Sequence, residues 1–431
     1  MLKLDIARRL LTLEAIDSNP EHINELADAL SRLSHDFPEA LGLPTYFAGP
    51  FYQRRQYAAA CRLLMIDDAE HRSPASAYLL ALSLAHEGQL ENATALMDWA
   101  YATSPVLCNG FAVIGSIASE NGNLAGSIQL AERDLASGRL TPQWQLNLAQ
   151  QYERNGESHR AEATVDRAYH EDPSLKDGYA RLGLVRAQTM EWCSAAGIMD
   201  RDLTAGRMTA VYKLHLAWFL ANLGEWSDAE ALATDAYGEN PDLSDGMCRL
   251  GWTGYLRGKG KGYFADMIAR DRSSGRFRLR GQLFHALYLA ITGHSDRAER
   301  IAEDAYQRHL EEVNWKAAIG WTLMRSGNTD EACRFLDFDH DAGRMTTIMY
   351  PSYAVALNTV GRNDDAMAVL RKLPASTEVD KVLLVGFQIC PDATLPAAKF
   401  TQMIKNGAGL ADFARESITP SYWLRHSIGA L

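Results

Sequence analysis

The sequence predicts an all-α fold in which helical hairpins repeat along the chain. Three observations support this prediction: glycines recur at a fixed interval, alanines recur at fixed distances after them, and the residues between read as two amphipathic helices. At about 150 residues per domain, a chain of 431 residues would hold two or three domains, but a repeat array does not follow that rule.

The glycine positions define the period of the repeat, which is about 34 residues. One step, between Gly258 and Gly293, is longer by a single residue, and Met190 occupies the one position without glycine. In each interval an apolar helix leads to the glycine, a short polar turn follows, and a second amphipathic helix ends about sixteen residues later. Each repeat is therefore predicted to be a helical hairpin. The glycines are Gly88, Gly122, Gly156, Gly224, Gly258, Gly293, Gly327 and Gly361.

Small residues stand where the two helices of a hairpin must approach each other. Alanine follows six of the eight glycines at a distance of five residues, and in four repeats a second alanine stands seven residues further on. Pro105, Pro173 and Pro241 then end the second helix in three repeats. This order of Gly, Ala, Ala and Pro in a hairpin of this length resembles the tetratricopeptide repeat, and the resemblance covers residues 74–373 as nine units.

The resemblance implies a right-handed superhelical solenoid that binds a protein or peptide on the concave wall formed by the first helix of each hairpin. The pentatricopeptide repeat, which reads RNA, is the alternative hairpin of similar length. Its arrays are usually basic, whereas this chain has a net charge of −11, and the alanine and proline positions match the tetratricopeptide pattern better. We therefore expect no nucleic-acid partner.

A second motif recurs at twice the repeat interval and predicts a two-hairpin super-repeat of about 68 residues. In every second hairpin an aspartate is followed, at the fourth and fifth positions after it, by a Gly-Arg pair. The alternate hairpins carry Ala-Tyr at the same place. The motif residues are Asp134/Gly138/Arg139, Asp202/Gly206/Arg207, Asp271/Gly275/Arg276 and Asp339/Gly343/Arg344.

Two interpretations of this motif remain open. The glycine is expected in the left-handed conformation that closes a helix, and the arginine can bond the freed carbonyl groups. An aspartate in the last helical turn opposes the helix dipole, so it should have a compensating partner, for which the arginine is the nearest candidate. In the first interpretation these contacts fix the turn between hairpins. In the second, Arg139, Arg207, Arg276 and Arg344 form a ladder with steps of about 20 Å that grips an extended acidic ligand.

Composition places the chain among ordinary folded proteins. Hydrophobic residues make up 47% of the sequence, which suffices for a buried core, but no apolar run is long enough to span a membrane. The first twenty residues have charges within the apolar stretch and do not read as a secretory signal. We therefore expect a cytoplasmic protein without membrane insertion. Six cysteines are spread singly, with neither disulfide-framework nor metal-ligand spacing.

No motif in the sequence predicts catalysis. Residues 258–262 hold three glycines, but their spacing matches neither a phosphate loop nor a dinucleotide fingerprint, so we expect a lengthened, mobile turn with Lys259 and Lys261 exposed. Residues 337–343 alternate acids but lack the closing Glu of a calcium loop. His215 and His285, on apolar first helices, are expected to be satisfied core residues. We therefore expect no enzyme activity, no catalytic residue, no cofactor and no metal site.

The first helices supply the candidate binding residues. Trp218, Trp252, Tyr255 and Trp321 are expected to line the concave wall, together with the four motif arginines. Two interpretations again remain: these aromatic side chains pack against neighbouring helices, or they form a groove in which Trp, Tyr and Arg anchor a partner.

The two ends of the chain are predicted to cap the array. Residues 1–73 read as degenerate hairpins and residues 374–431 as a helical cap, in which Tyr422 and Trp423 dock on the array or join two copies as a homodimer.

The sequence thus favours a non-catalytic scaffold that binds a segment of another protein. The alternative is the recognition arm of an assembly, binding an anionic polymer or a sugar-related substrate for a separate enzyme.

Overall fold

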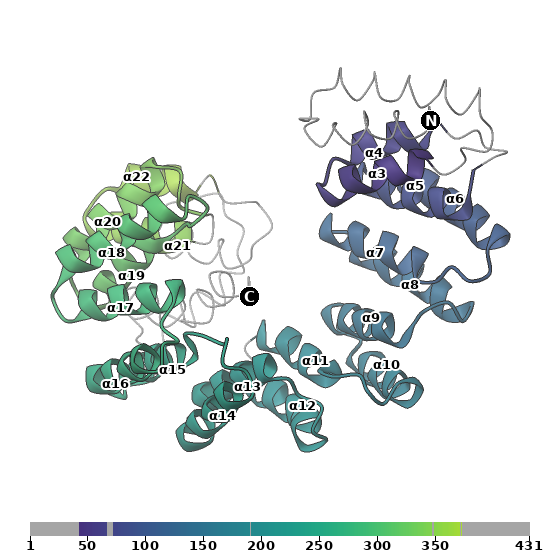
Figure 1. The fold of residues 1–431 in the computed structure, drawn as a ribbon. Coiled ribbons are helices and arrows are strands. Elements are labelled where there is room, and N and C mark those ends of the chain that lie inside the picture. The colour runs from purple at the N-terminus through teal and green to yellow at the C-terminus, as the bar shows by residue number, and fades with distance from the viewer. Residues whose placement is uncertain (1–42, 67–71, 190, 347–348, 371, 373–431) are drawn as a thin grey trace, which may run out of the picture. The chain divides into compact units, whose positions relative to one another are not determined.

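The computed structural model describes residues 43–66, 72–189, 191–346, 349–370 and 372, and within them the regular structure is helical, with no strand. Figure 1 shows the helices following one another as antiparallel pairs. The all-α repeat fold predicted from the sequence is confirmed. Both predicted caps lie wholly or mostly outside the described residues, as do Tyr422 and Trp423.

The chain divides into two compact units, residues 1–182 and 183–431. The described helices up to the division are α3 (Leu43–Gln53), α4 (Tyr57–Leu64), α5 (Pro74–His86), α6 (Leu90–Thr103), α7 (Gly110–Glu120), α8 (Leu124–Ala136), α9 (Pro142–Arg154), α10 (Ser158–Glu171) and α11 (Gly178–Ala187), which contains it. Those that follow are α12 (Trp192–Thr204), α13 (Ala210–Leu223), α14 (Trp226–Glu239), α15 (Gly246–Leu256), α16 (Gly260–Ser273), α17 (Leu279–Ile291), α18 (Ser295–Arg308), α19 (Trp315–Arg325), α20 (Thr329–Asp341), α21 (Tyr350–Thr359) and α22 (Asn363–Leu370).

Several consecutive hairpins in each unit pack through their first helices. In the first unit α5 contacts both α3 and α7, and in the second unit α13, α15, α17, α19 and α21 contact one another in succession. In most of the described hairpins the second helix packs on its own first helix and also touches the first helix of the next hairpin, as α16 packs on α15 and touches α17. The alanines predicted at the helix crossings are fully buried, among them Ala93, Ala161, Ala229, Ala298 and Ala332.

Glycine on a first helix allows the two backbones of a hairpin to touch. At Gly320 in α19, an added Cβ atom would lie 2.8 Å from the carbonyl oxygen of Ala332 in α20, and at Gly115 in α7 it would lie 2.7 Å from that of Ser127 in α8. A side chain at either position would force the helices apart. This explains why the sequence keeps glycine in the middle of these helices despite its low helix propensity.

The predicted left-handed closure of the Asp-containing helices is confirmed at all four motifs, where φ lies between 67° and 72° at Gly138, Gly206, Gly275 and Gly343. The prediction of a lengthened turn near Gly258 is wrong. Three residues separate α15 from α16, as three separate α7 from α8. The extra residue instead lengthens the second helix, since α16 has 14 residues whereas α8 has 13.

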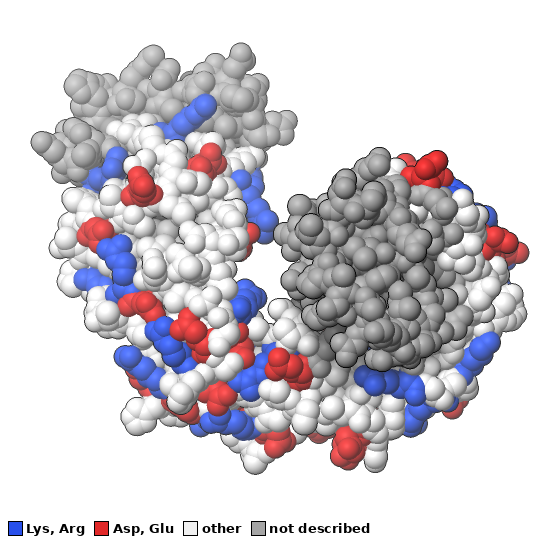
Figure 2. Space-filling view, turned by 180° about the vertical axis from the view of Figure 1, so that it is seen from behind, with Lys and Arg blue, Asp and Glu red and all other residues white. Residues whose placement is uncertain are grey.

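None of the described helices combines the length and the apolar character needed to cross a membrane. On the face shown in Figure 2, basic and acidic side chains are interspersed over the described helices.

The close contact at Gly320 makes a direct prediction. Gly320→Ala should lower the free energy of unfolding by about 1–3 kcal/mol, because the added methyl group meets backbone rather than a movable side chain. Gly197→Ala in α12 is the matched control: no atom lies within 4 Å of its added Cβ, so the variant should be up to about 1 kcal/mol more stable. Urea denaturation followed by circular dichroism measures both. Equal effects of the two substitutions would contradict the proposed backbone contact.

Candidate binding site on the first helices

A tyrosine–aspartate–arginine clasp joins two consecutive hairpins at three of the four predicted motifs. In the first copy, Tyr101 at the end of α6 donates its hydroxyl proton to Oδ1 of Asp134 in α8, at 2.7 Å. The same hydroxyl oxygen accepts the backbone N–H of Gly110, at 2.5 Å, and Oδ2 of Asp134 accepts that of Ala112, at 2.8 Å. The clasp thus satisfies amides at the start of α7 that have no partner within the helix.

The motif arginine completes the clasp by covering the tyrosine. The Arg139 guanidinium carbon lies 4.2 Å from the centre of the Tyr101 ring. Its terminal nitrogens donate to the carbonyl oxygens of Tyr101, Ser104 and Leu107, at 3.2, 3.4 and 3.3 Å. These contacts support the interpretation in which the arginine bonds turn carbonyls. The sequence suggests this arginine as the partner of Asp134. The charge of Arg139 does act to lower the pKa of that carboxyl, but the hydrogen bonds that the carboxylate accepts come from a tyrosine and a backbone amide.

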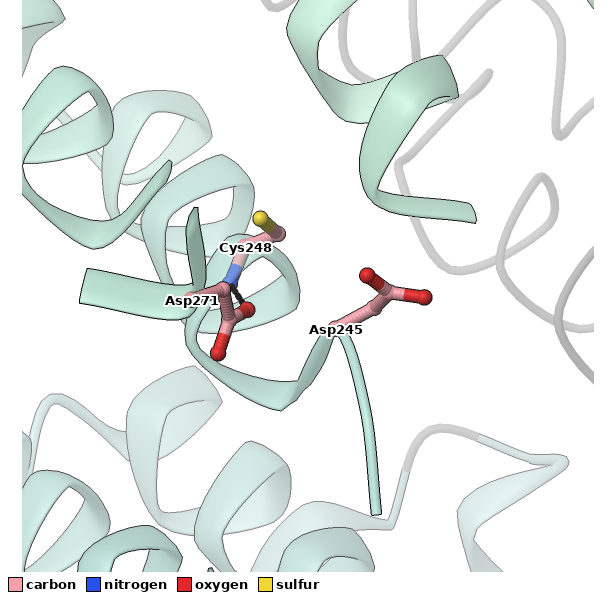
Figure 3. A group of neighbouring side chains, drawn as sticks. All are labelled: Asp245, Cys248 and Asp271. Atoms are coloured by element: carbon pink, nitrogen blue, oxygen red, sulfur yellow. Dashed lines mark hydrogen bonds between the residues drawn. The ribbon is translucent and has the colours of Figure 1, made fainter. Parts of the chain in front are cut away.

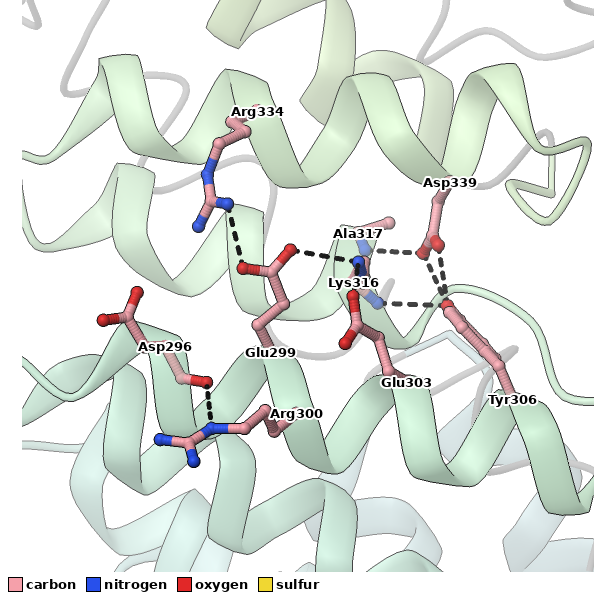
Figure 4. Close-up of polar contacts among 9 residues, drawn as sticks. All are labelled: Asp296, Glu299, Arg300, Glu303, Tyr306, Lys316, Ala317, Arg334 and Asp339. Carbon is pink, nitrogen blue, oxygen red and sulfur yellow. Dashed lines mark hydrogen bonds and ion pairs between the residues drawn. The ribbon is translucent and has the colours of Figure 1, made fainter.

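Two further copies lie in the second unit. They consist of Tyr237, Asp271 and Arg276, and of Tyr306, Asp339 and Arg344. The tyrosine-to-aspartate distance is 2.7 Å in both, and the arginines lie over the tyrosine rings at 4.6 and 4.3 Å. Figure 4 shows Tyr306 and Asp339 of the third copy, in which Asp339 also accepts the N–H of Ala317. At the remaining motif Asp202 is fully buried, and Arg207 is half-buried like the other three arginines.

The clasp carboxylates act only as hydrogen-bond acceptors. Burial raises the pKa of the Asp134, Asp271 and Asp339 carboxyls, and the hydrogen bonds that they accept oppose this rise. Burial likewise raises the pKa of the clasp tyrosines, so their hydroxyls stay protonated and donate. Each clasp is therefore a buried network in which both acid oxygens face a donor.

One cluster in the second unit has the composition of a metal site. A ligand atom from each of Asp245, Cys248 and Asp271 lies within 4.8 Å of the others (Figure 3). Asp271 belongs to the clasp and accepts the N–H of Cys248 at 2.8 Å, and Asp245 accepts the N–H of Arg278 at 2.8 Å. Burial raises the pKa of the Cys248 thiol and so disfavours a thiolate ligand. These hydrogen bonds indicate that the two carboxylates have a structural role.

The predicted aromatic residues of the wall pack against one another. Trp218, Trp252 and Trp321 are 6%, 2% and 2% exposed, and Tyr255 is half-buried. The Trp252 ring lies 5.7 Å from that of Tyr255 and 6.3 Å from that of Trp321, whereas Trp218 contacts Trp192 at 5.0 Å. The structure thus brings three of the four residues together. Ligand anchoring by these residues and by the four arginines stays a prediction.

A cavity of about 330 Å³ opens beside Trp218, between α13, α15, α17 and the loop that precedes α15. Three basic side chains line it: His215 from α13, Arg249 from α15 and Arg280 from α17. The Arg249 guanidinium lies on the Trp218 ring, 3.8 Å from its centre. Apolar side chains complete the lining, among them Leu214 and Phe284.

Two basic groups of the cavity hold polar atoms away from water. Nε of Arg249 and Nδ1 of His215 are buried without a hydrogen-bond partner. Burial, with a contribution from Arg280, lowers the pKa of Arg249 to about 9, and burial, with a contribution from Arg249, lowers that of His215 to about 3. The expectation that His215 is a satisfied core residue is therefore wrong. The sequence alone does not distinguish Arg249, since Arg181 stands at the equivalent position of another first helix.

The geometry of the repeat decides the type of fold. A left-handed glycine follows the first helix at each of the eight regular positions, and fully buried alanines lie where the two helices cross. The fold is that of a tetratricopeptide-like repeat.

Comparisons with solved structures concern the fold alone. The tetratricopeptide-like chain is similar to a tetratricopeptide repeat protein from Parabacteroides merdae, with 16% identity over 57% of this chain and 98% of that chain and a TM-score of 0.41. It is also similar to the APC/C hetero-tetramer Cut9–Hcn1, with 12% identity, coverages of 93% and 92% and a TM-score of 0.36. For yeast Tom70 the identity is 12%, the coverages are 91% and 98%, and the TM-score is 0.44. No protein-family model and no curated protein sequence matches the chain.

The clasp predicts that removing one tyrosine hydroxyl group lowers the free energy of unfolding. Tyr237→Phe keeps the shape of the ring but leaves Asp271 and the N–H of Gly246 without their shared partner inside the core. We expect the free energy of unfolding to fall by about 1–3 kcal/mol.

Tyr263→Phe is the matched control for this change. The Tyr263 hydroxyl donates to Glu230 at 3.0 Å in a half-buried position, where water can replace the lost group. Its loss should cost below about 1 kcal/mol. Denaturation of both purified variants measures the difference, and a Tyr237→Phe protein as stable as the wild type would show that the clasp does not stabilise the array.

Proposed function

We propose that the chain is a non-catalytic tetratricopeptide-like scaffold that binds a segment of another protein on the first helices of its second unit. The observation that carries this proposal is the partly exposed apolar surface of α13 at the cavity, together with Tyr255 further along α15. Val211 is 44% exposed at its rim, Leu214 is half-buried within it, and Tyr255 is half-buried on α15. Partly exposed apolar side chains beside a concave site are typical of protein-binding surfaces.

The mechanism of this binding is burial against a preformed surface. The clasps fix the starts of α15 and α19 before any ligand arrives, so little of the binding free energy is lost in ordering the scaffold. An apolar side chain of the partner that enters the cavity would gain about 1.5–3 kcal/mol from burial. A few such anchors, surrounded by contacts that exclude water, suffice for a specific complex.

A photo-reactive amino acid placed at Val211 tests where the partner binds. In the native host it should cross-link a partner protein, whereas the same probe at Thr234, exposed on the second helix α14, should not. With the purified partner, Val211→Glu should weaken binding at least tenfold, because it places a charge in an apolar contact, and Thr234→Glu should leave the affinity unchanged. Equal cross-linking from both positions, or equal affinities of both variants, would contradict the proposal.

A further inference from the structure

In the helices that the structure describes in the second unit, two buried lysines have carboxylate partners, whereas Arg249 has none. The side chain of Lys316 is 1% exposed and pairs with Glu303 at 3.0 Å and Glu299 at 3.1 Å (Figure 4). Lys213, 11% exposed, pairs with Glu239 at 2.6 Å and also with Asp235. These pairs follow the rule that a charge removed from water keeps a counter-charge.

Arg249 breaks this rule. Its guanidinium lies against Trp218 on one side and has the positive charge of Arg280 nearby, and its Nε is buried without an acceptor. Among the described residues, no carboxylate forms an ion pair with it. Arg249 is half-buried, with its Nε out of water. A guanidinium drawn partly out of water without a counter-charge is costly, so a position that keeps one calls for a reason other than stability.

Of the two aspartates that line the cavity with Arg249, one is engaged and the other is exposed, and the nearby helix-start amides are engaged. Asp245, which lines the same cavity, accepts the N–H of Arg278, and Asp242 is exposed at the rim. The amides of Gly246 and Met247 at the start of α15 donate to the Tyr237 hydroxyl, at 2.7 and 3.2 Å. The helix start therefore offers neither of these donors to a ligand, and the cavity depends on its side chains for recognition.

The side chains of the cavity combine oxyanion donors with an apolar wall. A guanidinium presents a planar fork that matches the two oxygens of a carboxylate or phosphate. Neutral His215 can donate one further hydrogen bond, because one ring nitrogen of a neutral imidazole carries a proton. Leu214, Leu243 and Phe284 form the apolar part of the lining. A volume of about 330 Å³ suits a ligand the size of a large amino-acid side chain.

We propose that this cavity binds an oxyanion, either a carboxylate or a phosphate, that is attached to an apolar group. The oxyanion lies between Arg249 and Arg280, and the apolar group lies against Phe284 and the leucines. This inference does not depend on the proposed function, since the oxyanion can belong to a free small molecule or to a residue of a bound protein.

Calorimetric titration of the full chain with four small probes tests the chemistry. N-acetylphenylalanine and phenyl phosphate carry an oxyanion on an apolar group, N-acetylphenylalaninamide lacks the charge, and inorganic phosphate lacks the apolar group. We expect one or both of the first two to bind at least tenfold more tightly than the last two, and whichever binds more tightly identifies the source as carboxylate or phosphate. Binding of the amide equal to that of the acid, or no binding of either charged probe, would overturn the proposal.

Variants of Arg249 separate ligand binding from folding. Arg249→Met keeps an apolar stem on Trp218 and removes the charge, so probe affinity should fall at least tenfold while the thermal midpoint of the ligand-free protein stays the same or rises. Arg249→Lys keeps the charge without the fork and should lose only part of the affinity. Arg257→Met, at an exposed position just after α15, is the control and should bind as the wild type does. Wild-type probe affinity in Arg249→Met, with or without a fall in the thermal midpoint, would assign Arg249 to the fold alone.

Discussion

The hydrogen bond between a buried tyrosine and a buried aspartate is the constraint on which the two-hairpin unit depends. The tyrosine ends one hairpin, the aspartate lies on the second helix of the next hairpin, and both accept amides from the start of the helix between them. Neither group can be left unsatisfied in the core without a large cost. The hairpins are therefore joined two by two, and the sequence repeats over two hairpins instead of one.

The left-handed residue before α7 extends this junction toward the next pair. Asn109 has φ of 60°, its side-chain oxygen accepts the N–H of Thr141, and its own N–H donates to the carbonyl of Arg139. Asp245 and Asn314 repeat this arrangement with Arg278 and Thr346. One short-chain polar residue thus connects the clasp to the start of the following hairpin, which is why Asn or Asp is kept at a position that most residues would find strained.

The sequence allowed the hairpins and their period to be predicted because those features depend on local chemistry. A glycine that turns the chain and an alanine that admits a neighbouring helix act within a few residues of their place in the sequence. The tyrosine–aspartate bond was not predicted, because its partners lie in different hairpins, as Tyr101 and Asp134 do, although Ala-Tyr recurs in step with the aspartate. The lack of a counter-charge at Arg249 in the described part of the chain could not be predicted, because it depends on how far the acids of other segments lie from its guanidinium in the folded chain.

The clasp also explains how the first helices can differ from one another without loss of the fold. Its hydrogen bonds involve the ends of second helices, the connecting loops and backbone amides, so few side chains of the first helices are committed to it. The position of Arg249 accordingly holds Val113, Arg181 and Ala318 in the equivalent helices. Nη1 of Arg181 donates to the amide oxygen of Asn147 at 3.0 Å, although its Nε, like that of Arg249, is buried without an acceptor. A costly side chain can therefore be retained at one position of one repeat, because the interactions that hold that repeat in place lie elsewhere.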